Sequence, residues 1–448
     1  MEQDGSVAAE GGVRCDRRAL LAGAISIATL PLAACGGRDD RTTLRWWSPQ
    51  AAPEQRRAYR AQIEAFEAAN PTLRVVFEPT SDEGYPAQLA AAFAAKQAPN
   101  LVTHLPSFAA QSYYAQGLLE PMDAVIEAVG VDRFLPGANQ VYRAADGHYA
   151  ATGIGSTAVD MLWVRTDLMR DAGIAAIPRT WDELRDACRR MQKGAVYGAP
   201  LPFGSNGMTS LVFIGFIHRA GGQVFTPDLD VALDSQPTYD ALEFYRSMRE
   251  LCPSGATNFG WADSLNAFVS GGTATGIYGG RVLINVARQN PRIADTIRCT
   301  TYPTISPAVA PWTFNDFPSM FIPRGASHLA ETRALAASLL DSEGYIRQLL
   351  SAPGHVLPVV RDIADSPSYR SNPITAKFAP QIEAMTLAAS RGHNLGSESP
   401  AHRPNVKAGE IIASNVIAEM VQRVVLSGEP PKAAVKAAAA RIEGIMRV

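Results

Sequence analysis

Cysteine is scarce in this chain: 448 residues contain five, and only Cys188, Cys252 and Cys299 lie beyond residue 40. They form no CxxC motif and no Cys/His cluster with metal-ligand spacing, which argues against a zinc module or a disulfide-rich scaffold. Cys188 falls in an apolar helical pattern and is predicted to be a small core residue. A Cys252–Cys299 disulfide stays open as an alternative in an oxidising compartment.

Positive charge is not in excess either, since 41 Lys and Arg face 43 Asp and Glu. A net charge of −2 argues against a nucleic-acid partner, which demands a basic face. The sequence also lacks a GxSxG elbow, an HExxH pair, a P-loop and a glycine-rich nucleotide fingerprint. We therefore expect no catalytic residue, no metal and no cofactor. The remote alternative is a glycoside hydrolase that uses Asp160 with Asp167, or Asp228 with Asp230.

The one long apolar run, residues 19–34, is too short to span a bilayer, which needs about 20 residues. It follows Arg14, Arg17 and Arg18 and ends in small residues, as an export signal does. We expect residues 1–34 to be removed. The remaining chain, 47% apolar and 19% charged over the whole sequence, suffices for two or three ordered domains.

The end of the signal, 32–35 (LAAC), resembles the lipobox of bacterial lipoproteins. This resemblance implies that Cys35 carries a diacylglycerol and a further acyl chain such as palmitate, and that residues 35–40 form a tether. The lipid would then be the only membrane attachment. Arg17-Arg18 followed by apolar residues resembles a twin-arginine export signal, with the general secretory route as the alternative.

Strands and helices alternate after the tether. Residues 43–47, 73–77 and 101–105 read as strands, and 54–69 and 85–97 as helices. This βαβαβ order predicts a parallel sheet whose ligands bind beyond the carboxyl ends of its strands. Trp46 and Trp47 alternate on the first strand, so we expect Trp46 in the core and Trp47 exposed at the strand end.

The middle of the chain continues the pattern. Strands are expected at 159–164 and 274–278, and Thr180 with Glu183 predicts a capping box at the start of a helix. Trp163 and Trp181 are assigned to packing. A strand at 319–322, a helix at 329–340 and a helical C-terminal third follow.

Five segments in this order resemble motifs of one family. They are 146–150 (DGHYA), 162–168 (LWVRTDL), 172–174 with 178–184 (AGI, PRTWDEL), 268–274 (FVSGGTA) and 341–343 (DSE). The chain is similar to the extracellular solute-binding proteins of ABC importers, in the branch of the maltodextrin and glycerol-phosphate receptors.

This resemblance implies an α/β, two-lobed periplasmic-binding-protein fold whose discontinuous lobes are joined by hinge strands. The first lobe would hold 41–150 and 300–345, and the second 151–299 and 346–448. It also implies a monomeric, non-enzymatic receptor in the periplasm or at the cell exterior that delivers its ligand to the importer's permease subunits. Residues 311–317 depart from the family's glycine-rich turn, which suggests a smaller or differently shaped cleft.

Sugars need flat aromatic side chains for stacking and polar groups at the rim. The expected ligand residues are Trp47, Ser48, Glu83, Tyr85, Ser107, Ser156, Thr157, Asn206, Trp261, Tyr278, Gly280, Arg281, Trp312, Asn315 and Arg403. The expected ligand is a mono- to oligosaccharide. A glycerophosphodiester or another phosphorylated polyol is the alternative, because Arg281 and Arg403 suit a phosphate. His104 and His402 are expected to be surface or capping residues.

Overall fold

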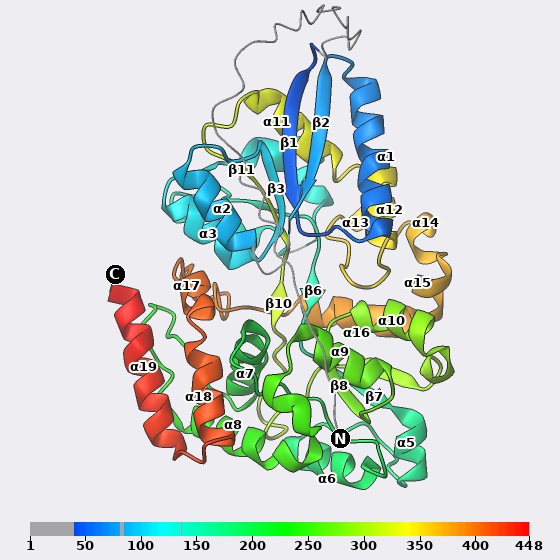
Figure 1. Ribbon diagram of the computed structural model, residues 1–448, viewed down its shortest axis with the longest axis vertical. Helices are drawn as coiled ribbons and strands as arrows, with labels where there is room; N and C mark the ends of the chain where they lie inside the picture. Colours follow the sequence, from blue (N-terminus) through cyan, green and yellow to red (C-terminus); the bar gives the residue numbers. More distant parts are fainter. Residues whose placement is uncertain (1–39, 81–84, 136, 448) are drawn as a thin grey trace, which may run out of the picture. The chain divides into compact units, whose positions relative to one another are not determined.

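The first part of the chain forms the predicted parallel sheet (Figure 1). In the computed structural model, β1 pairs in parallel with both β2 and β3, and β11 runs antiparallel to β3. The short strands β4 and β5 also pair antiparallel with β11. The described strands of this sheet are β1 (Thr42–Ser48), β2 (Leu73–Pro79), β3 (Leu101–Leu105), β4 (Leu119–Glu120), β5 (Thr152–Gly153) and β11 (Ser319–Pro323).

Helices from both ends of the chain pack with this sheet into one hydrophobic cluster, here called the first core. Its buried side chains run from Leu44 to Ile154 and from Phe317 to Tyr369. The helices are α1 (Pro53–Ala69), α2 (Tyr85–Ala94), α3 (Ser107–Ala115), α4 (Asp123–Val129), α11 (Leu329–Ser338), α12 (Ser342–Leu350), α13 (Arg361–Ala364) and α14 (Pro367–Arg370), with 3₁₀ turns at Val131–Arg133 and Gln140–Tyr142.

A second sheet forms the centre of the second core. Here β7 (Met161–Arg165) lies antiparallel between β8 (Thr275–Tyr278) and β9 (Ile297–Thr300). The surrounding helices are α5 (Thr166–Asp171), α6 (Trp181–Met191), α7 (Gly207–Arg219), α8 (Gln236–Ser247), α9 (Trp261–Val269), α10 (Arg281–Gln289), α15 (Pro373–Lys377), α16 (Ala379–Ala389), α17 (Ala408–Ala413), α18 (Val416–Val425) and α19 (Pro431–Arg447). Further 3₁₀ turns lie at Arg249–Leu251, Ser254–Asn258 and Pro291–Ile293.

The chain crosses between the two cores along a short antiparallel pair, β6 (Thr157–Ala158) and β10 (Asn315–Asp316), visible between the sheets in Figure 1. Buried side chains follow this crossing: Tyr302 and Phe314 pack in the second core, whereas Tyr345, Val360 and Tyr369 pack in the first. The chain returns to the first core only after β10.

The start of α6 and the burial of three tryptophans bear on the local predictions. The capping box is confirmed, since Thr180 accepts a hydrogen bond from the Glu183 N–H and Glu183 reaches back to Thr180. Trp163 and Trp181 are buried, as the packing assignment requires. The predicted exposure of Trp47 is wrong: its side chain is only 6% exposed. Cys188 is buried as expected, whereas the alternative of a Cys252–Cys299 disulfide is contradicted, because both sulfurs are free.

The structure describes residues 40–80, 85–135 and 137–447, and Arg41–Val448 make up one compact unit. The export signal, the twin-arginine pair, Cys35 and Glu83 lie outside the described residues. Within those ranges, no helix is both long and apolar enough to cross a membrane.

Candidate ligand site

The crossing strands bring buried polar side chains together between the cores. Ser156 donates from its hydroxyl to Asn315 Oδ1 at 3.2 Å, and Thr157 donates to the Asp316 carbonyl at 3.0 Å. The Asn315 amide also donates to the carbonyl of Ala389 in α16. Three of the predicted ligand residues are therefore adjacent, and in this conformation they bond to one another or to the backbone.

Asp316 links this crossing to the first sheet. Its carboxylate accepts hydrogen bonds from the Ser107 N–H at 3.1 Å and the Ser107 hydroxyl at 3.4 Å, at the start of α3. Asn394 of the second core donates its amide to the same hydroxyl at 2.9 Å. Burial raises the pKa of Asp316 to about 6, although the bonds from Ser107 oppose this shift. Segments far apart in the sequence thus meet at one predicted residue, Ser107.

The other first-sheet candidates serve the framework in this conformation. The Trp47 indole N–H donates to Glu78 on β2, and Arg45 holds the same carboxylate at 2.8 Å. The Tyr85 hydroxyl donates to the Trp47 carbonyl at 3.0 Å. Ser48, fully buried, lies 3.2 Å from His104 Nδ1. Trp47 is buried because the neighbouring parallel strand supplies an acceptor for its N–H.

In the second core, aromatic candidates lie at the ends of β8 and α9. Trp261 begins α9, is 37% exposed, and meets Tyr278 edge to face with ring centroids 5.7 Å apart. Trp312 is buried and stacks on His218 at 4.2 Å. Of these rings, Trp261 offers the most open surface for stacking a ligand.

Two further candidates have other local roles. The Asn206 side chain caps α7 by accepting from the Thr209 N–H, and its amide donates to the Phe259 carbonyl. Arg403 is exposed and lies 3.7 Å from the carboxylate of Asp228, which is exposed too. The structure does not bring either residue into the group around Asp316.

A contact between two glycines joins the cores beside the crossing. A Cβ atom on Gly280 would lie 1.7 Å from the carbonyl oxygen of Gly354, in the loop between α12 and α13. Only a residue without a side chain permits this approach. The contact places Arg281, the first residue of α10, against His355, with Nη2 3.0 Å from Nε2.

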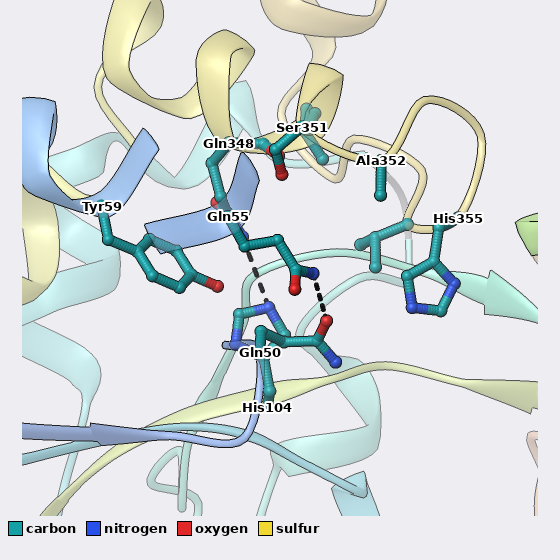
Figure 2. A pocket seen from close by; sticks show the side chains of 10 residues that line it. Gln50, Gln55, Tyr59, His104, Gln348, Ser351, Ala352 and His355 are labelled. Atoms are coloured by element: carbon teal, nitrogen blue, oxygen red, sulfur yellow. Dashed lines mark hydrogen bonds between the residues drawn. The ribbon is translucent and has the colours of Figure 1, made fainter. Parts of the chain in front are cut away.

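His355 opens onto a small pocket lined chiefly by polar side chains (Figure 2). Gln50, Gln55, Tyr59, His104, Gln348 and His355 contribute to the lining. Gln55 donates to Gln50, and the Gln348 amide lies 3.3 Å from His104 Nε2. The free volume is about 10 Å³, roughly the room that one water needs.

The sequence did not single out this pocket. His104 is expected at the surface or in a cap, but it lines the pocket, and burial lowers its pKa to about 3. Its place at the end of a predicted strand could have marked it, because strand ends face the crevice. Gln348 and His355 carry no comparable signal. Both residues follow α11 in the sequence, and Gln348 is 244 positions from His104, which it contacts.

Two of the carboxylates considered for hydrolysis, Asp160 and Asp167, are held by arginines instead. Asp160 is fully buried, forms an ion pair with Arg219 at 2.6 Å and accepts from the Phe314 N–H at 2.8 Å. Asp167 pairs with Arg165. In the described ranges, no group of three or more His, Cys, Asp or Glu side chains is placed to hold a metal ion.

Comparisons with known proteins agree with this architecture. The profile of the bacterial extracellular solute-binding protein family matches residues 52–346. YcjN of Escherichia coli (strain K12), named as a putative ABC transporter periplasmic-binding protein, is 21% identical over 370 residues, covering 81% of this chain and 83% of YcjN.

Two solved structures are similar over most of their length. Maltose-bound MalE3 of T. maritima has 18% identity and a TM-score of 0.77, covering 90% of this chain and 100% of its own. A solute-binding protein from Agrobacterium radiobacter K84, in complex with ribitol, has 18% identity and a TM-score of 0.75, covering 90% and 98%. The predicted two-lobed α/β fold class is confirmed.

Proposed function

Since the chain belongs to the family of bacterial extracellular solute-binding proteins, we propose that it is a non-enzymatic receptor that delivers a sugar or polyol to an ABC importer. Membership of an extracellular family means that the protein is exported. The ligand class is supported by the maltose and ribitol bound to two proteins of similar fold. The permease subunits of the importer would recognise the closed, loaded receptor.

The observation that carries this proposal is the group of polar side chains where the two lobes meet. The first lobe is the first core with its sheet, and the second lobe is the second core with its sheet. Ser107 belongs to the first lobe, Asp316 to the crossing and Asn394 to the second lobe, and all three share hydrogen bonds. Hydroxyl, carboxylate and amide groups that converge from both sides of a hinge suit the hydroxyls of a sugar or polyol.

The pocket at His355 has room for roughly one water and therefore admits no sugar in this conformation. We infer that the ligand enters between the lobes and that the hinge closes on it. The described chain passes between the cores along two short strands and once more after α14, and rotation at these crossings leaves the packing inside each core intact. Trp261 and Tyr278 remain our candidates for stacking on the ligand, with Ser107, Asn315 and Arg281 for its polar groups.

A screen by thermal shift, followed by calorimetry and small-angle X-ray scattering, tests this proposal. The panel should include mono- and oligosaccharides, polyols, glycerophosphodiesters and polyamines. We expect a sugar or polyol to raise the melting temperature and to change the radius of gyration on binding. If no sugar or polyol binds, or if binding leaves the radius of gyration unchanged, the receptor proposal is wrong.

We further propose that Cys35 is lipidated and holds the receptor on the membrane, because residues 32–35 resemble a lipobox. Cys35→Ala should release the protein from the membrane fraction, and unchanged attachment would contradict the proposal. Replacement of Arg17 and Arg18 by Lys should stop export if the twin-arginine route is used. Normal export of that double variant would indicate the general secretory route.

A further inference from the structure

Arg281 stands at the junction of the two lobes and is partly buried there. Its guanidinium donates to His355 Nε2 at 3.0 Å, which joins α10 of the second lobe to the loop after α12 of the first. The neighbouring Gly280–Gly354 contact fixes the backbone on both sides of this bond. The position of Arg281 in the junction is therefore set by close packing as well as by the hydrogen bond.

The charge of Arg281 has no carboxylate partner within 4 Å among the described residues. Other arginines in the second lobe do have one: Arg219 pairs with Asp160 at 2.6 Å, and Arg165 pairs with Asp167. Arg403, the other predicted phosphate ligand, lies near Asp228 at the surface. A partly buried guanidinium has five N–H donors, and one imidazole nitrogen uses only one of them.

The pocket side of the junction adds no compensating carboxylate among the described residues. The pocket beside His355 is lined by amide, hydroxyl, imidazole and apolar groups, with no carboxylate among its lining residues. His355 itself is neutral, because burial and the nearby Arg281 hold its pKa well below the usual value. Among the described residues, the junction thus presents one positive charge without a carboxylate partner next to neutral hydrogen-bonding groups, which favours an anion and opposes a cation such as choline or a polyamine.

We propose that Arg281 recognises an anionic oxygen group, a carboxylate or a phosphate, on the sugar or polyol that this receptor binds. This inference rests on the proposed function and deepens it by naming a charged ligand class. The planar guanidinium matches either group with two parallel N–H···O bonds. On ligand binding the anion takes the donors of Arg281 that His355 leaves unused.

Calorimetry with matched pairs of probes tests the inference. Gluconate is compared with sorbitol, glucuronate with glucose, and glycerol 3-phosphate with glycerol, and choline serves as the cationic probe. Wild-type protein should bind at least one acidic probe about tenfold or more tightly than its neutral counterpart, as expected for hydrogen bonds to a charged group. Comparison of the carboxylate pairs with the phosphate pair shows which anion is preferred.

The variant Arg281→Gln should lose this preference, so that the acidic and the neutral member of each pair bind with similar affinity. Arg281→Lys, which keeps the charge but not the fork, should retain part of it. The matched control is Arg292→Gln, which removes the same charge from an exposed position in the same lobe and should behave as wild type. Melting temperatures of the unliganded variants identify any loss of folding.

The outcomes separate the two proposals. Tighter binding of the neutral member in every pair, or an unchanged acidic preference in Arg281→Gln, would overturn the role of Arg281 and leave the sugar or polyol receptor intact. Preferential binding of choline would likewise overturn it. Should the protein bind none of the sugars, polyols and acidic derivatives, the receptor function itself would be wrong.

Discussion

The closed arrangement of the lobes depends on a glycine, and the change Gly280→Ala should weaken ligand binding by preventing full closure. The added methyl carbon would lie 1.7 Å from the Gly354 carbonyl oxygen, whereas ordinary contact begins near 3.4 Å. The obstacle is backbone, so no side-chain rotation relieves it. The two turns must therefore move apart until the distance between the added carbon and the carbonyl oxygen is about twice 1.7 Å.

The cost can be worked out from the contacts that this movement breaks. Arg281 Nη2 and His355 Nε2 are 3.0 Å apart, and the same displacement takes them beyond hydrogen-bonding distance. A hydrogen bond to a charged group contributes about 1.5–3 kcal/mol. Because the apparent dissociation constant varies inversely with the population that can close, this loss corresponds to roughly 10- to 100-fold weaker binding.

Calorimetry with a ligand from the screen measures this effect, and scattering reports whether the complex still closes. Gly444→Ala is the matched control. Gly444 lies in α19, and a Cβ atom added to it would meet nothing within 4 Å, so alanine should leave affinity unchanged and stabilise the helix by about 0.5–1 kcal/mol. If Gly280→Ala binds with wild-type affinity and closes to the same radius of gyration, the Gly280–Gly354 contact does not belong to the ligand-bound form.

Three further predictions concern stability, each measured by urea unfolding. Asp160→Ala should lower the free energy of unfolding by about 3–5 kcal/mol, since it leaves Arg219 buried without its partner; a loss below about 1 kcal/mol would contradict a buried pair. Trp181→Ala should cost about 3–5 kcal/mol without weakening ligand binding, and lost affinity at an intact melting temperature would place this ring in the site instead. For Asp316 the folded-state pKa is raised from 3.8 to about 6, so its contribution to stability is complete below pH 3.8 and is lost as pH rises through 6. Asp316→Asn should remove this dependence of the free energy of unfolding on pH. In the wild type the pH-dependent part is at most about 3 kcal/mol, because some solvent reaches the side chain. A variant with the same pH dependence as wild type would refute the shift.

Local and periodic features of the sequence predicted most of the fold. The alternation of strands and helices at the start yields the parallel sheet because each element buries one apolar face. The capping box at Thr180 follows from two residues three positions apart. Patterns of this kind are complete within a few residues, so no knowledge of distant contacts is needed.

Contacts between distant residues decided the parts that the sequence did not predict. Trp47 reads as exposed from its place at a strand end, but the carboxylate that accepts its N–H comes from Glu78 on the next strand. His104 reads as a surface residue until Gln348, 244 positions later, is placed beside it.

The hydrogen bonds of the closed arrangement also set what a ligand must supply. Without ligand, Asp316 and Asn394 share the Ser107 hydroxyl, and Arg281 donates to His355, so closure already satisfies these groups in part. Opening exchanges those bonds for bonds to water. A ligand that bonds to one lobe only has equal affinity for the open and closed forms and leaves their ratio unchanged. Closure on binding therefore requires a molecule that places polar atoms against both the Ser107 group and Arg281.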